Sequence, residues 1–419
     1  MNLQSIGCAV HVLALCPRYQ IFKVKKQRNH EMFDEVSEFA VPAIVEHHEQ
    51  VRHKVNKFKF NEYASIALAR AVQNMGGVRK YSLKPILDSS AKWSSTIEMD
   101  ERDWFLRRAY AEVARSHPQL VKFPFRDSDY IMSRNCAGIL RPFQHASNIL
   151  QKDGEPVSIV LPVFAALRKQ LESTVQIEVC GPTMGTTEFL SEEQLDEHCQ
   201  NLRKNLRSEV DRHLHHIMRF KSVLEIAASV DPRYKSLAFL PKEQIQSAQQ
   251  LLCAAVIEHA KQNDIVSPAD EVANHDRHDE MHNKYPRKRS FVGMDSFMGV
   301  MNKVSRCSNS EGSERIEDLE HEQMLLKKMC KAEVRAWFAK DQLAIQSDPI
   351  FWWRQNHEHW PYIAPVARKY LSIPSSNAGI ERMFSSCREL LEHTRQSMGS
   401  TSVERSIKLF MNMEYLGMF

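Results

Sequence analysis

The sequence feature that most constrains the fold is the helical spacing of apolar residues between Pro349 and Phe419. One apolar series recurs at i, i+3, i+4, i+7 and i+11, and a second series follows near the C-terminus. The first comprises Ile380, Met383, Phe384, Cys387 and Leu391, and the second comprises Val403, Ile407, Phe410 and Met411. Five aromatic residues precede both series: Phe351, Trp352, Trp353, Trp360 and Tyr362. The pattern predicts two amphipathic helices beside an aromatic cluster, which is typical of either a dense core or an interface.

Composition limits the class of protein. The chain has 419 residues, of which 43% are hydrophobic and 26% charged, as in a soluble globular protein of two or three domains. No run of eighteen apolar residues exists, so neither a membrane span nor a membrane partner is expected. The nine cysteines are scattered without a CxxC pair, which argues against a disulfide framework and favours a reducing compartment. A net charge of +4 permits contact with nucleic acid but does not argue for it.

Most of the remaining chain also shows helical patterns. Apolar spacing predicts one helix over residues 40–71, whose basic side chains form either a solvated or a phosphate-contacting face. Further helices are predicted over residues 157–171 and 202–217 and from Leu319 onward, and Arg141-Pro142-Phe143 is expected to open another. Thr401 followed by Glu404 fits a capping box for the last helix. The predicted fold class is therefore mainly α.

Three segments interrupt the helical pattern. Residues 173–192 are interpreted as a loop, and residues 262–316, which are polar and rich in His and charge, as a flexible linker. The end of a helix is predicted at the run Asp231-Pro232-Arg233-Tyr234-Lys235. Because an aspartate in a turn before proline is usually structural, Asp231 is not interpreted as catalytic.

Several motifs occur in a fixed order along the chain. Cys8 and His11 form a CxxH motif, Trp93 lies in a KWSST run, and Pro142 with Phe143 lies in an LRPF run. Asp231, Pro232 and Arg233 open the DPRYK run described above. The C-terminal part adds FWW, ARKYLSIP and SSNAGIERMFS. This series resembles the hAT (hobo/Activator) transposases and the BED-zinc-finger-type proteins derived from them.

The resemblance implies a domain organisation. Residues 1–39 would be a remnant of an RNase-H-like core with the CxxH motif, and residues 40–261 a helical insertion domain. Residues 262–316 would be the linker, and residues 317–419 the hAT C-terminal dimerisation region. The residues expected at the dimer interface are Trp352, Trp353, Trp360, Tyr370, Leu371, Phe384, Ile407 and Phe410.

Catalysis in this family depends on three carboxylates that hold two divalent metal ions. Glu381 matches the third carboxylate by its motif, and the resemblance places the two aspartates before CxxH. The chain begins seven residues before Cys8, and its first aspartate is Asp34, so we expect both catalytic aspartates and any BED zinc finger to be absent. No metal site and no cofactor are then expected, and Mg²⁺ would bind only in an intact transposase. In the simpler interpretation, Glu381 is an early-helix carboxylate that pairs with Arg382 or Arg388.

Together these inferences predict a transposase-derived nuclear protein that is not an enzyme and dimerises through its C-terminal region. The expected partners are a second copy or related hAT proteins, with DNA or chromatin as a further candidate. Two alternatives stay open: a fragment of an active hAT transposase that cleaves and joins DNA, and a helical scaffold with no nucleic-acid role.

Overall fold

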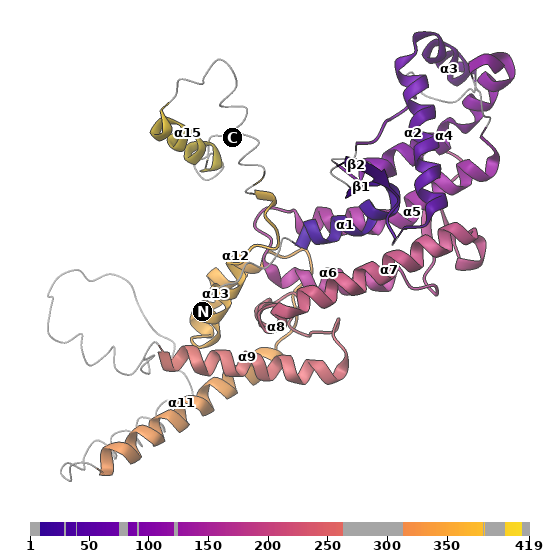
Figure 1. The fold of residues 1–419 in the computed structure, drawn as a ribbon. Coiled ribbons are helices and arrows are strands. Elements are labelled where there is room, and N and C mark those ends of the chain that lie inside the picture. The colour runs from indigo at the N-terminus through magenta and orange to yellow at the C-terminus, as the bar shows by residue number, and fades with distance from the viewer. Residues whose placement is uncertain are drawn as a thin grey trace.

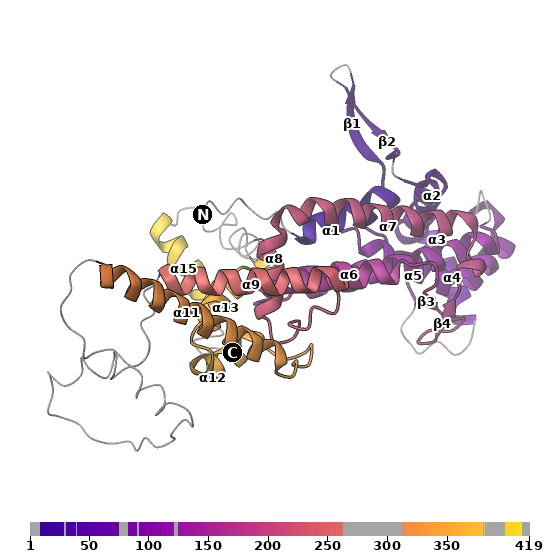
Figure 2. The same ribbon diagram turned by 90° about the horizontal axis from the view of Figure 1, so that it is seen from below.

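Helix α5 (Asp127–Leu150) organises the first half of the chain. The computed structural model describes residues 9–28, 31–38, 40–74, 83–89, 92–120, 125–262, 313–379, 381 and 399–412. Within these residues, α5 contacts α1, α4, α6, α7 and strand β3. It can pack on several sides because buried residues occur on successive turns and around much of the helix. The body is elongated, with α2, α3 and α4 at one end and α9 and α11 at the other (Figures 1 and 2).

The N-terminal apolar stretch forms helix α1 (Ala9–Ile21), which packs on α5 and α7. Leu13, Cys16 and Ile21 on its inner face are fully buried. A hairpin of β1 (Val24–Arg28) and β2 (Glu31–Glu35) follows, with Val24 opposite Glu35.

The helical pattern predicted over residues 40–71 is confirmed, but it forms two helices and not one. The chain forms α2 (Pro42–Phe60) and α3 (Glu62–Asn74), separated at Asn61. Asn61 is extended, and its side-chain oxygen accepts a hydrogen bond from the Ala64 backbone N–H at 2.9 Å, which starts the second helix. α3 then packs on α4 (Ser95–Ser116), which begins within the KWSST run and contains Trp104. η1 (Pro118–Leu120) ends this section.

Two further predictions in the middle of the chain are corrected. Pro142 and Phe143 do not open a helix but lie inside α5, where Phe143 is fully buried. Residues 173–192 contain a hairpin of β3 (Ile177–Cys180) and β4 (Thr187–Leu190), with Ile177 opposite Leu190. Gly138 of α5 makes this packing possible, since a Cβ there would lie 2.7 Å from the Glu178 carbonyl oxygen.

The rest of the chain adds helices that pack back on these elements. The elements are η2 (Val157–Ile159), α6 (Val160–Gln170), η3 (Glu192–Gln194), α7 (Glu197–Ile217), η4 (Met218–Phe220), α8 (Lys221–Val230), α9 (Lys242–Gln262), α11 (Ser313–Ala339), α12 (Pro349–Asn356), η5 (His357–His359), α13 (Ile363–Leu371) and α15 (Ser400–Asn412). The predicted helix over 202–217 and the helix stop at Asp231 are confirmed. The last helix begins at Ser400, so Thr401 is not its N-cap, and Glu404 instead pairs with Lys408.

One core cluster joins residues from α1 to α13, including Leu13, Phe143, Leu206 and Val366. It crosses the predicted boundaries at 39/40 and at the linker, and those boundaries stay a prediction. Residues 263–312, which hold most of the predicted linker, lie outside the described residues.

The mainly α fold class is confirmed. The sheets of the described part of the chain are two-stranded hairpins, and assignment of the helices to an RNase-H-like fold stays a prediction. None of the helices found in the described ranges is long and apolar enough to cross a membrane.

A buried ion pair joins α2 to α4. The Lys54 ammonium lies 2.7 Å from Oδ1 of Asp103, and both side chains are almost fully buried. The ammonium also lies over three rings, those of Phe125, Tyr130 and Tyr110, at 3.5, 4.3 and 4.9 Å from their centroids. Burial lowers the pKa of Lys54 and raises the pKa of Asp103, while the attraction between the two groups opposes both shifts.

Removal of one partner of this pair should destabilise the protein strongly. Asp103→Ala leaves the Lys54 ammonium buried without a counter-charge, which costs about 3–5 kcal/mol of unfolding free energy. Replacement of both residues, in Lys54→Met with Asp103→Leu, should cost less than the single change. The matched control is Glu112→Ala in the exposed pair with Arg115, with a change within about 0.5 kcal/mol. Urea unfolding measures all three, and an Asp103→Ala variant as stable as the control contradicts the argument.

Candidate functional site: the tryptophan cluster and groove of the C-terminal region

Four tryptophans, from α11, from α12 and from the position directly after η5, meet at the end of α8. Trp337 is fully buried, and its ring centroid lies 5.1 Å from that of Trp353, 5.3 Å from Trp360 and 5.5 Å from Trp352. The indole N–H of Trp337 donates to the Ser229 carbonyl at 2.7 Å, and that of Trp353 donates to the Val230 carbonyl at 3.0 Å. These carbonyls belong to the last turn of α8, which has no partners within its own helix. The cluster therefore caps α8 as well as filling the core.

The DPRYK turn after α8 is held by a buried charge network. Asp231 accepts hydrogen bonds from Ser158 Oγ at 2.6 Å and from Arg233 Nη2 at 2.9 Å. Arg233 also donates to Glu155 Oε1 at 2.6 Å, and Lys235 Nζ donates to the Trp337 carbonyl at 2.6 Å. The motif residues thus tie the turn to the segment before α6 and to the end of α11, and their contacts are those of a structural site.

The residues predicted at the dimer interface fall into three groups. Trp353, Trp360, Tyr370 and Leu371 are buried in the chain's own core, with exposed fractions of 7%, 8%, 9% and 4%. Trp352 is partly buried beside them. Phe384 lies outside the described residues, and Ile407 and Phe410 belong to α15, where the side chains at these two positions are not described. Their shared role in dimerisation stays a prediction.

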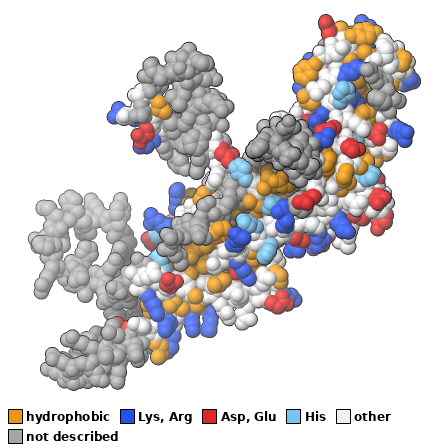
Figure 3. Space-filling model, viewed as in Figure 1, with side chains coloured by type: hydrophobic (Ala, Val, Ile, Leu, Met, Phe, Trp, Pro, Cys, Tyr) orange, Lys and Arg blue, Asp and Glu red, His pale blue; other side chains and the backbone are white. Residues whose placement is uncertain are grey.

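A large groove lies beside the tryptophan cluster. Its volume is about 1160 Å³, and it is bounded by α12, α13 and the Gly154–Pro156 turn. The turn is held in place by the segment after α13, because Val157 N–H donates to the Ile373 carbonyl at 2.8 Å and Ser375 N–H to the Glu155 carbonyl at 3.0 Å. In Figure 3, hydrophobic side chains reach the surface along the body of the molecule between charged groups.

The groove has an apolar floor and a charged rim. The apolar lining residues are Pro156, Ile350, Trp353, Pro361, Ala364, Pro365, Ala367, Leu371 and Pro374. The ionisable lining residues are Glu155, His259, Arg354, His357, Glu358 and Arg368. This arrangement fits the docking of an amphipathic element better than chemistry on a small substrate.

Comparison with known proteins identifies the region that contains the cluster and the groove. Residues 328–413 match the hAT family C-terminal dimerisation region. This part of the chain is therefore similar to a hAT dimerisation region. A curated human protein, "Zinc finger BED domain-containing protein 4", is 24% identical over 314 residues, which cover 73% of this chain and 22% of that protein. Both findings confirm the resemblance to hAT transposase-derived proteins of the BED zinc-finger type.

Within the hAT region, Glu381 lies beside His11 of the CxxH motif. Glu381 Oε1 is 3.4 Å from His11 Nε2, and both side chains are more than half exposed. The fold thus brings together two motif residues that lie 370 positions apart in the sequence, and sequence reasoning did not predict this contact. Cys8 lies outside the described residues. In the part of the chain that the structure describes, no three His, Cys, Asp or Glu side chains converge as metal ligands would.

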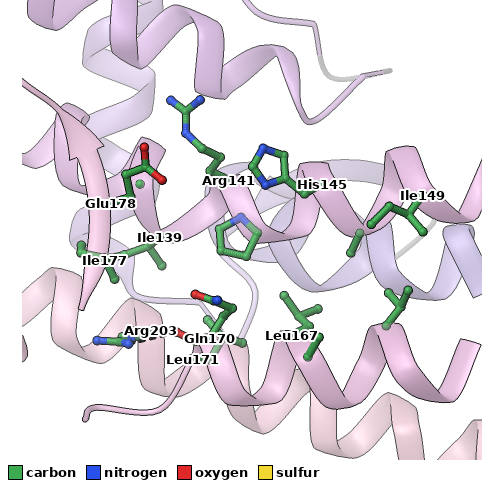
Figure 4. A pocket seen from close by; sticks show the side chains of 15 residues that line it. Ile139, Arg141, His145, Ile149, Leu167, Gln170, Leu171, Ile177, Glu178 and Arg203 are labelled. Atoms are coloured by element: carbon green, nitrogen blue, oxygen red, sulfur yellow. Dashed lines mark hydrogen bonds between the residues drawn. The ribbon is translucent and has the colours of Figure 1, made fainter. Parts of the chain in front are cut away.

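The other motif residues are packing positions. Trp93 belongs to the main core, and Pro142 lines a smaller cavity of about 290 Å³ between α5, α6 and β3 (Figure 4). Arg203 at its edge is nearly fully buried, and its guanidinium donates to the carbonyls of Gln170, Glu172 and Val175. These bonds hold the turn after α6 in place.

Glu333 links α11 to the start of α13 and was not predicted as a functional residue. Its carboxylate accepts hydrogen bonds from the backbone N–H groups of Tyr362 and Ile363, at 3.0 and 2.8 Å. Burial raises the pKa of Glu333 to about 7, although these hydrogen bonds act in the opposite direction. The link joins two helices of the hAT region, so its protonation bears on how firmly α13 is held.

The raised pKa of Glu333 predicts a pH-dependent stability. Between pH 4.5, the usual value for the unfolded chain, and about 7, the native state binds more protons than the unfolded state. The contribution of Glu333 to unfolding stability should therefore be fully present below pH 4.5 and lost as the pH rises through 7. In Glu333→Gln, which keeps a hydrogen-bond acceptor but does not titrate, this part of the pH dependence should vanish. Denaturant unfolding of both proteins at pH 5 and pH 8 measures this pH dependence. If the unfolding free energy changes equally between the two pH values in both proteins, the assignment to Glu333 is refuted.

Proposed function

We propose that this protein forms a homodimer through the hAT region and acts as an interaction protein, not as an enzyme. The observation that carries the proposal is the match of residues 328–413 to a dimerisation region, which contributes α12 and α13 to a large groove with many apolar lining residues. An exposed apolar surface of this kind is typical of a protein–protein contact. Related hAT proteins are the alternative partners in a hetero-oligomer.

The proposed lack of catalysis is supported by the surroundings of Glu381. Two-metal strand cleavage needs several hard oxygen ligands from separate elements to hold the ions. One contact that Glu381 makes across the fold is to the imidazole of His11, and both groups are open to solvent. Glu381 is then a surface carboxylate of the hAT region that is not required for the dimer.

Association with DNA or chromatin in the nucleus is the second part of the proposal. It is supported by the similarity to a protein named for its BED zinc finger, and the net charge of +4 permits contact with nucleic acid. A positive protein gains affinity for DNA by releasing counterions from the phosphates, so such binding is weakened by salt.

An active hAT transposase, of which this chain would be a part, is the alternative function. The proximity of His11 and Glu381 favours it, because these residues come from two motifs of the catalytic domain in the resemblance described above. In that case Glu381 would ligate a metal together with carboxylates supplied by the rest of the protein.

The full chain should be a dimer in solution. Size-exclusion chromatography with light scattering at micromolar concentration should give twice the 48.5 kDa of one chain. A tagged copy should also retain an untagged copy on an affinity resin, and the untagged copy alone serves as the control. A strict monomer in both measurements rules out the proposal.

Binding and cleavage of DNA can be measured in one experiment. With a labelled duplex and Mg²⁺, the chain should retain DNA at low salt, lose it as salt rises, and leave both strands intact. Glu381→Gln should behave identically. Strand cleavage that requires Mg²⁺ and disappears in Glu381→Gln would establish the transposase alternative, and absence of salt-dependent retention would remove the DNA-binding part of the proposal.

A further inference from the structure

The groove beside α13 is at the upper end of the size range of ligand sites. Its volume of about 1160 Å³ exceeds the roughly 300–1,000 Å³ of typical ligand pockets. Its floor is apolar over the length of α12 and α13, and half-buried residues such as Ile350, Ala364 and Pro365 are open to an incoming chain. A groove with these properties fits the apolar face of a helix.

Helix α15 is an amphipathic helix without a large packing partner in the described residues. On a 3.6-residue period, positions 403, 407, 410 and 411 share one face, and all four carry apolar residues. Arg405 and Thr401 lie on the opposite face and are exposed. Figure 1 shows α15 standing clear of the helical body, and the groove lining includes no residue of α15.

We propose that α15 of a second copy docks in the groove formed by α12, α13 and the Gly154–Pro156 turn, and that the exchange is reciprocal. This inference rests on the proposed dimer and names its contact surfaces. The groove and α15 both lie largely within residues 328–413, the matched dimerisation region, so one region supplies the receptor and the ligand. Reciprocal docking gives each subunit the same two surfaces, as a two-fold symmetric dimer requires.

The pattern of anchors supports this occupant. Val403, Ile407 and Phe410 have the i, i+4, i+7 spacing by which helices bind in grooves. A helix of 13 residues is about 20 Å long, enough to lie across two short helices. Glu404 borders the apolar face, and the groove rim offers Arg354 and Arg368 as partners for its carboxylate.

Substitutions are the suitable test, because Trp353 and Val366 belong to the main core and removal of the region would disturb the fold. Ala364→Glu puts a carboxylate on the groove floor at the start of α13, a position where helices accept acidic residues. Ile407→Lys puts a charge on the apolar face of α15. Each variant should raise the dimer dissociation constant on the order of 100-fold.

Matched controls lie on the same two helices. Lys369→Glu changes an exposed residue of α13 that does not line the groove, and Arg405→Glu changes the opposite face of α15. Both should dimerise like the wild type. A mixture of Ala364→Glu and Ile407→Lys chains should recover part of the affinity, since the new carboxylate and ammonium meet in one of the two grooves of a mixed dimer. Circular dichroism checks that every variant is folded.

Cross-linking identifies which copy supplies the helix. Wild-type chains with and without ¹⁵N label are mixed and treated with a lysine cross-linker, and the Lys408–Lys369 product should join labelled to unlabelled chains. A product only within one chain means that α15 fills its own groove and overturns the inference. A wild type that is monomeric removes the proposed dimer itself, whereas a dimer unaffected by both substitutions keeps the dimer and refutes this docking site.

Discussion

The end of helix α8 is the point on which the C-terminal half of the structure depends. Its last carbonyls are buried, and a buried carbonyl without a partner is costly. Trp337 and Trp353 supply the missing donors from helices that lie more than 100 residues further along the chain. These two hydrogen bonds are directional, so they fix the orientation of α11 and α12 on α8 where apolar contact alone would leave it free to vary.

The charge network after α8 fixes the position of one wall of the groove in a similar way. Arg233 is held by Asp231 and reaches Glu155, and Glu155 in turn accepts the backbone N–H of Ser375. The turn that forms one wall of the groove is therefore connected through Arg233 to the end of α8. The DPRYK motif, which the sequence indicates only as a helix stop, thus positions the groove that is proposed to bind a second copy.

The sequence predicts those parts of the fold that depend on local chemistry. Helical periodicity locates α7, α11 and α15, and the proline after Asp231 marks the end of α8. It does not reveal the break at Asn61, because one capping side chain inside a continuous apolar pattern is a weak signal. Nor does it reveal the β3–β4 hairpin, which is specified by close approach to Gly138 of a distant helix. The contact of His11 with Glu381 is likewise a product of tertiary structure.

The tryptophans show why the role of the residues in the candidate site could not be predicted from the sequence alone. Aromatic residues dominate both cores and interfaces, so their presence in a dimerisation region cannot separate the two roles. In the structure the indole N–H groups of Trp337 and Trp353 are bonded inside the chain, and Trp360 is buried with them. These three side chains are therefore already held within the chain by hydrogen bonds or burial in the absence of a partner. In the proposed dimer a second copy would contact the half-buried face of α13 and the groove beside it, where Trp353 forms part of the lining.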